Sequence, residues 1–193
     1  MKLKTHVFSA FVLYTVFDMF FFHKIVTWNP LASFTFRLYM FIAAYFFNYL
    51  IDIVGHSFRE YNGRIYPARN KLHSLPVMTG ISIALYSPTL YYYYFINRDI
   101  QMIWITLLYA FLLALVHFVE DAVTEAGVYV GDRKVRLPVR IRYDDPYANG
   151  VAKFVFLGLL AISFIYYINN IGFEHVDLSS LVFFIASLIY LVK

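Results

Sequence analysis

Residues 100–119 read IQMIWITLLYAFLLALVHFV, an apolar run that contains no acidic or basic side chain other than His117. A helix needs about 20 predominantly apolar residues to cross the hydrocarbon core of a bilayer. Immediately after this run come Glu120 and Asp121. The stretch therefore predicts a membrane-spanning helix with ionisable groups gathered at one end.

The rest of the chain repeats this apolar character. Of its 193 residues, 61% are hydrophobic and 15% are charged, whereas soluble domains are about 45–50% apolar and about 25% charged. This composition excludes an ordinary soluble enzyme and a nucleic-acid-binding domain that relies on a basic surface. We expect an all-α membrane protein, a bundle of about six transmembrane helices in a single polytopic domain spanning residues 1–193. The expected helices are 5–22, 34–54, 75–96, 100–119, 151–168 and 178–192.

The basic residues indicate how such a bundle would be oriented. If the N-terminus is inside, thirteen of the 16 Lys and Arg residues lie on the inner side, and only Lys24, Arg37 and Arg98 lie outside. Cytoplasmic loops carry an excess of Lys and Arg. We therefore expect a multi-pass protein of the cell membrane with both termini in the cytoplasm.

One of the two long inner loops, 120–150, contains a strand-like pattern. Apolar and basic residues alternate over 134–143, with Pro138 among them, which is typical of an edge strand. Gly131-Asp132 could connect this strand to 128–130 in a small β-hairpin. Its basic face has two open interpretations, a contact with anionic lipid headgroups or a solvated strand.

Histidines and carboxylates cluster on the inner side. Asp52 with His56, and His117 with Asp121, are each four residues apart, so each pair lies on one face of a helix. A single pair of this kind can simply form a hydrogen bond, but its repetition in several segments favours metal binding. Because the chain has no cysteine, any ion would be held by imidazole and carboxylate, a set that suits zinc. The predicted ligands are His6, Asp52, His56, His73, His117 and Asp121, enough for one or two ions.

Four short motifs of the chain carry polar residues of the predicted site. They are Thr5-His6, LIDIVGH at 50–56, RNKLHS at 69–74 and HFVEDAVTEAGV at 117–128, followed by Arg136-Leu137-Pro138. With these motifs in this order, the chain resembles the prokaryotic membrane-bound metal-dependent hydrolases, including the LexA-regulated inner-membrane hydrolases, as a divergent branch. Val54 stands where the family often has a second aspartate, and Leu72 where it has threonine.

The resemblance and the clustered ligands together suggest a function. We expect a metal-dependent hydrolase that acts at the cytoplasmic membrane surface on a phospholipid, a lipid-linked phosphate or a similar ester. Its partners would be membrane lipids and an amphiphilic substrate, with no nucleic acid. Glu120 or Glu125 would be the general base, Arg69 would stabilise developing negative charge, and the loops 55–74 and 120–150 would cap the site.

A non-enzymatic metal-binding scaffold or a transporter is the alternative. Transporters commonly place polar residues near the bilayer midplane, whereas the polar residues of this chain gather at one end. Asp18 is the acidic residue of the apolar runs that falls outside the cluster. We expect it to snorkel or to make a local hydrogen bond rather than to carry a transported ion.

Overall fold

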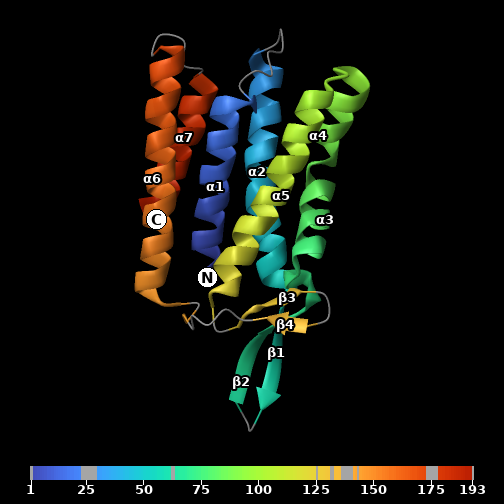
Figure 1. The fold of residues 1–193 in the computed structure, drawn as a ribbon, viewed down its shortest axis with the longest axis vertical. Coiled ribbons are helices and arrows are strands. Elements are labelled where there is room, and N and C mark those ends of the chain that lie inside the picture. The colour runs from blue at the N-terminus through green and yellow to red at the C-terminus, as the bar shows by residue number, and fades with distance from the viewer. Residues whose placement is uncertain are drawn as a thin grey trace.

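The protein is a bundle of helices with two small antiparallel hairpins at one end, as the computed structural model shows (Figure 1). The structure describes residues 2–22, 30–61, 64–124, 126–130, 133–135, 141–142, 144–172 and 178–192. Its helices are α1 (Leu3–Phe20), α2 (Pro30–Val54), α3 (Leu75–Leu85), α4 (Ser87–Tyr91), α5 (Ile100–Ala122), α6 (Pro146–Ile171) and α7 (Leu178–Val192).

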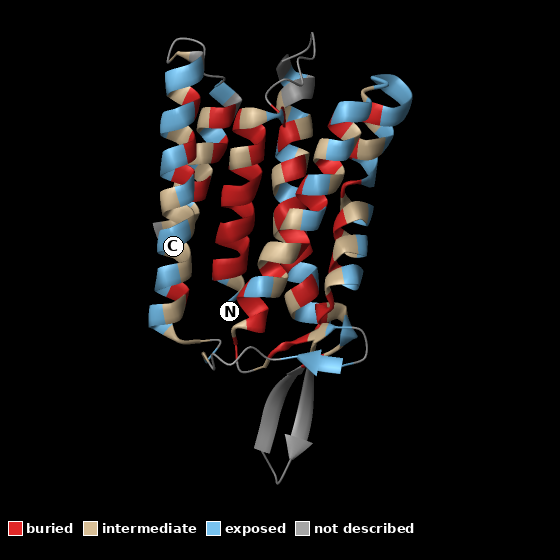
Figure 2. Cartoon of the chain, viewed as in Figure 1, coloured by how far each residue is buried: buried red, intermediate tan, exposed pale blue. Residues whose placement is uncertain are grey.

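Helix α1 occupies the interior of the bundle. It packs against α2, α5, α6 and α7, and burial extends along almost its whole length (Figure 2). Polar side chains are costly where a helix faces lipid, but a helix surrounded by protein can carry them. His6 and Asp18 are both buried on α1, near its two ends.

Among the described residues, three helices are long and apolar enough to cross a membrane, over Phe34–Val54, Ile100–Ala122 and Pro146–Asn170. That is fewer than the six expected spans. Helix α1 carries polar side chains into the bundle, while α3 and α7 have only 11 and 15 residues. Helix α6 presents large apolar side chains outward, including Phe154 and Ile162, which are 76% and 69% exposed.

The segment 75–96, expected to be one helix, is divided into three pieces. Helix α3 ends at Leu85, α4 follows from Ser87, and the π-helix η3 (Tyr92–Ile96) completes the segment. Proline has no backbone N–H and disrupts a continuous helix, but it fits the first turn of a new one. Pro88 lies in the first turn of α4, so the prediction of an unbroken span was wrong at this point.

Two hairpins lie at the same end of the bundle. Strands β3 (Val128–Val130) and β4 (Arg133–Val135) pair antiparallel, which confirms a hairpin in the loop 120–150. The longer strand predicted over 134–143 falls partly outside the described residues, because 136–140 and 143 are not among them. Strands β1 (His56–Tyr61) and β2 (Arg64–Arg69) form a second hairpin that was not predicted.

Candidate metal centre

Segments far apart in the sequence meet at the hairpin end of the bundle (Figure 1). They are the start of α1, the last turns of α2 and α5, and the short 3-10 helix η2 (Lys71–His73). His6 on α1 contacts Glu120 on α5 across 114 positions of sequence. In the hairpin of β1 and β2, the register pairs His56 with Arg69, so the first residue of β1 and the last residue of β2 also reach this region.

The carboxylate of Asp121 lies at the centre of the cluster and is fully buried. Its Oδ1 lies 2.5 Å from Nη2 of Arg69 and 3.1 Å from Nε2 of His6. Its Oδ2 lies 3.3 Å from Nε2 of His117 and 3.4 Å from Nε2 of His73. One carboxylate therefore faces three imidazoles and a guanidinium.

The distances between imidazole nitrogens and carboxylate oxygens match the ligands of a metal ion. Two atoms each bound about 2.0–2.1 Å from a tetrahedral zinc lie about 3.3 Å from one another. The contacts of Asp121 Oδ2 with His117 and His73 have this separation, and Asp52 Oδ1 lies 3.7 Å from Nε2 of His117. Such spacing is longer than an ordinary hydrogen bond between these groups.

Two of the imidazoles are held so that Nε2 points into the cluster. Nδ1 of His6 donates to Oε2 of Glu120 at 2.6 Å, and Nδ1 of His117 donates to Oδ1 of Asn48 at 2.7 Å. The amide of Asn48 donates in turn to the carbonyl O of Ala44, and Ser9 donates to Glu120. A proton on Nδ1 leaves the lone pair on Nε2, the arrangement common to metal-bound histidine.

Several buried atoms of the cluster have no hydrogen-bond partner among the described residues. They are Nε2 of His6, Nε2 of His117, both ring nitrogens of His73 and Oδ2 of Asp52. Buried polar atoms are nearly always hydrogen-bonded, so a convergence of unsatisfied acceptors and lone pairs requires an explanation. The donor set therefore fits divalent-cation binding, since an ion held by His6, Asp52, His117 and Asp121 would satisfy the Nε2 atoms of both His6 and His117.

Arg69 forms hydrogen bonds with the C-terminal end of α5 and with the turn that follows it. Its Nη1 donates to the carbonyl O atoms of Asp121 and Gly127, at 3.0 and 2.9 Å, and to Oγ1 of Thr124 at 2.8 Å. Burial lowers the pKa of the Arg69 guanidinium, and the carboxylate of Asp121 opposes that shift. A cation at the C-terminus of a helix also interacts favourably with its carbonyl groups.

His73 is neutral in this environment. Burial lowers its pKa from 6.5 to about 2, against the opposing effect of the Asp121 carboxylate. The nearby His117, Arg69 and His56 lower it further. Since neutral imidazole is the form that binds metal ions, His73 is in its ligating state at physiological pH.

Asn70 and Gly55 fix the position of His73. The side-chain Oδ1 of Asn70 accepts from the N–H of Leu72, and its Nδ2 donates to the carbonyl O of Val54 at 3.0 Å. The N–H of Asn70 also donates to the carbonyl O of Gly55. A Cβ on Gly55 would overlap the imidazole of His73, so only glycine lets the ring approach this closely.

All six ligands predicted from sequence lie in this region. The ligating atoms of His6, Asp52, His117 and Asp121 form one group, and those of Asp52, His56 and His73 form another, each within 4.8 Å. Of the predicted catalytic residues, Glu120 and Arg69 adjoin the first group, while Glu125 lies outside the described residues. Asn48 was missed, although its position one turn before Asp52 was a usable signal.

A second polar cluster lies at the opposite end of α1. Oδ1 of Asp18 is 3.4 Å from Nε of Arg37, and Oδ2 accepts from Ser180 at 2.7 Å. Tyr14 donates to the carbonyl O of Arg37. Arg37 was expected on the outer side, near the start of the helix 34–54, and it lies on α2 with its side chain buried. Here the Asp18 carboxylate has protein partners on both oxygens, whereas Nε2 of His6 and Nε2 of His117 form no hydrogen bond with the described residues.

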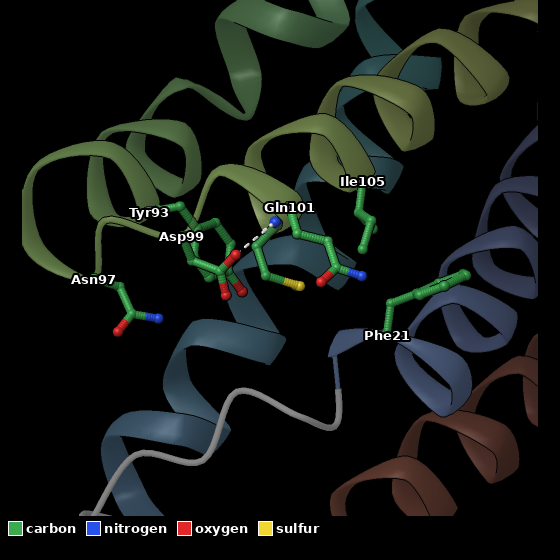
Figure 3. Close-up of a pocket in the computed structure, with 7 residues that line it drawn as sticks. Phe21, Tyr93, Asn97, Asp99, Gln101 and Ile105 are labelled. Carbon is green, nitrogen blue, oxygen red and sulfur yellow. Dashed lines mark hydrogen bonds between the residues drawn. The ribbon is translucent and has the colours of Figure 1, made fainter.

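A small cavity lies far from the candidate metal centre. It measures about 120 Å³, and its lining includes Tyr93, Asp99 and Gln101 (Figure 3). Asp99 caps α5, accepting from the N–H of Met102, whereas Asp121 lies near the other end of the same helix. At about 1.5 Å per residue the two ends are roughly 30 Å apart, so this cavity does not serve the cluster around Asp121.

Comparison with known proteins assigns the chain neither to a family nor to a function. No family model matches the chain, and searches of the curated proteins and of the solved structures found no match either. The side chains around Asp121 are therefore the basis for inferring a function.

Proposed function

We propose that this chain is a membrane-embedded, metal-dependent hydrolase that acts at the cytoplasmic surface of the membrane. One observation carries the proposal. Buried imidazole Nε2 atoms surround the Asp121 carboxylate at the spacing of ligands to a single ion, and they lack hydrogen-bond partners among the described residues. The ordered motifs that resemble the membrane-bound metal-dependent hydrolases support the same activity.

His6, Asp52, His117 and Asp121 would hold the ion. Nitrogen and oxygen donors at tetrahedral spacing, without thiolate, favour zinc. A divalent ion would supply a water that ionises near neutral pH and would polarise the bond under attack.

We assign Glu120 and Arg69 to positioning. Glu120 accepts hydrogen bonds from both His6 and Ser9, which suits it to orient His6. The hydrogen bonds of Arg69 to Asp121, Thr124 and Gly127 suit it to fix the Asp121 carboxylate. Carboxylates and carbonyls that orient metal-bound histidines raise metal affinity. Glu125 stays the candidate general base.

The surroundings of the cluster favour a lipid-like substrate. Asp52 and His56 are the partly exposed members of the cluster, and Ile53 and Val54 beside them are 53% and 55% exposed. An ester group that reaches Asp52 would therefore have apolar protein surface next to it. A phospholipid or a lipid-linked phosphate, with its chains in the bilayer and its headgroup at the surface, fits this arrangement.

The proposed orientation places both termini in the cytoplasm, and the absence of cysteine makes it simple to test. A single cysteine can be introduced at either end of the bundle, as Asn97→Cys or as Tyr147→Cys. Asn97 precedes α5, Tyr147 is in the first turn of α6, and both side chains are exposed. A membrane-impermeant maleimide added to intact cells should label only Asn97→Cys. Labelling of only Tyr147→Cys would invert the proposed topology.

Hydrolysis by the purified protein tests the activity. Phospholipids and synthetic phosphoesters should be cleaved, the cleavage should stop with a chelator, and added zinc should restore it. His117→Ala should be inactive, while Asn97→Ala, at the other end of the bundle, should be fully active. Chelator-insensitive cleavage or an active His117→Ala would contradict the metal mechanism. A protein that holds metal but cleaves none of these esters would favour the scaffold.

A further inference from the structure

Two groups of potential ligands share one carboxylate. His6, His117 and Asp121 belong to the first group, and His56 and His73 belong to the second. Asp52 belongs to both. A carboxylate common to two neighbouring sets of ligands is the usual bridge between two metal ions.

The two oxygens of Asp52 serve different neighbours. Oδ1 lies 3.7 Å from Nε2 of His117, in the first group. Oδ2 is buried and makes no hydrogen bond with the described residues. Because Oδ1 already faces the first group, Oδ2 is the atom available to the second.

His73 lies 3.4 Å from Oδ2 of Asp121 but is not one of the ligands of the first group. Its side chain is fully buried, and neither ring nitrogen forms a hydrogen bond within the described part of the chain. Leaving a buried polar group unsatisfied costs about 1–3 kcal/mol. One ion bound by the first group alone would leave this imidazole unexplained.

His56 is oriented in the way expected of a ligand. Its Nδ1 donates to the backbone carbonyl O of Asp52, so the lone pair is on Nε2. The ring of His56 meets that of His73 edge-on, with centroids 5.0 Å apart. The second group therefore contains an oriented imidazole, an unsatisfied imidazole and an unsatisfied carboxylate oxygen.

We propose that the cluster holds two divalent ions bridged by Asp52, the second bound by His56, His73 and Oδ2 of Asp52. This inference rests on the proposed function and specifies its substrate class. Metal pairs about 3.5–4 Å apart stabilise the attacking and leaving oxygens of an in-line displacement at phosphorus. A pair of ions bridged by Asp52 would suit the phosphoester of a lipid in this way.

The second site is the more accessible of the two. The Asp52 side chain is 11% exposed and His56 is half-buried, whereas His6, His117 and Asp121 are buried. With three protein ligands, the second ion would keep a position open, as catalytic metal sites do. A phosphate group would therefore reach the second ion first.

Manganese titration of the metal-free, full-length protein tests the inference without an activity assay. We expect two equivalents of bound Mn²⁺, and an electron paramagnetic resonance spectrum that gains the closely spaced hyperfine lines of a coupled pair with the second equivalent. His56→Ala should bind one equivalent and show an uncoupled spectrum. Asp144→Asn, which removes a partly exposed acid outside the cluster, should behave like the unaltered protein.

The outcomes separate this inference from the proposed function. One uncoupled equivalent in the unaltered protein would overturn the second site and leave a one-metal hydrolase standing. No bound manganese or zinc at all would overturn both. Two coupled equivalents that persist in His56→Ala and also in His73→Ala would show that the pair lies elsewhere.

Discussion

Oδ2 of Asp121 lies 3.3 Å from Nε2 of His117, one helical turn away on α5. The proton of His117 is directed the other way, toward Oδ1 of Asn48 at 2.7 Å. The carboxylate and the imidazole therefore present a negative charge and a lone pair to the same space. This relationship favours a cation between them over a direct hydrogen bond.

Asp121→Asn should remove the central ligand and destabilise the fold. Arg69 would stay buried without the charge it now faces at 2.5 Å. Removing one partner of a buried ion pair costs about 3–5 kcal/mol. Thermal unfolding in detergent should show the loss, and elemental analysis should show little bound metal.

Asp144→Asn is the matched control for that substitution. Asp144 pairs with Arg142 at 3.2 Å, but the two side chains are 37% and 72% exposed. Exposed pairs contribute about 0–1 kcal/mol, so stability and metal content should hardly change. Equal losses in the two variants would contradict the central role given to Asp121.

Glu120→Gln should weaken metal binding because Glu120 accepts the Nδ1 proton of His6 at 2.6 Å. Loss of such an orienting carboxylate lowers metal affinity or activity about 10–100-fold. Competition with a chromogenic chelator measures the affinity directly. Unchanged affinity with a loss of kcat alone would instead identify Glu120 as a general base, the role considered from sequence.

Gly55→Ala should displace His73 and the end of α2, because the added Cβ would overlap both the carbonyl O of Ile51 and the imidazole of His73. Forcing an atom into a packed site costs about 1–3 kcal/mol, and metal affinity should fall with stability. Gly80→Ala is the control, since nothing lies within 4 Å of the new Cβ and the position is inside α3. Alanine there should stabilise the helix by up to about 1 kcal/mol. Equal metal affinity in both variants would contradict the placement of His73.

Asp18→Asn should destabilise the protein without altering its metal content. It leaves Arg37 buried without the carboxylate 3.4 Å away, at a cost of about 3–5 kcal/mol. The double variant Asp18→Leu with Arg37→Met should recover much of that stability, since both charges are removed. Metal loss in the double variant would mean that this cluster contributes to the metal centre.

The positions of the helices could be predicted from the sequence, but the break within the segment 75–96 and the hairpin of β1 and β2 were not predicted. Long apolar runs predicted where the major helices lie. The spacing of four residues predicted that Asp121 and His117 share one face of α5. Pro88 could have predicted the break after Leu85. Asn62-Gly63, a dipeptide typical of tight hairpin turns, was the signal for the unpredicted hairpin of β1 and β2.

Contacts between distant segments could not be predicted in the same way. The pairing of Asp18 with Arg37 depends on how α1 and α2 pack, and so does the burial of α1 by its neighbours. The polar side chains of α1 and the short lengths of α3 and α7 account for finding three candidate spans among the described residues rather than six. The predicted ligands lie close together because they share one end of the bundle. The hydrogen bond from His6 to Glu120 joins residues of two different helices and could not be predicted from their spacing in the sequence.

Metal content of the protein purified without added metal tests the central claim most directly. Elemental analysis, normalised to protein concentration, should find about two zinc or similar divalent ions per chain, in keeping with the two groups of ligands. Asp121→Asn prepared in parallel should contain almost none. Metal-free protein that also fails to bind zinc or manganese on titration would contradict the account.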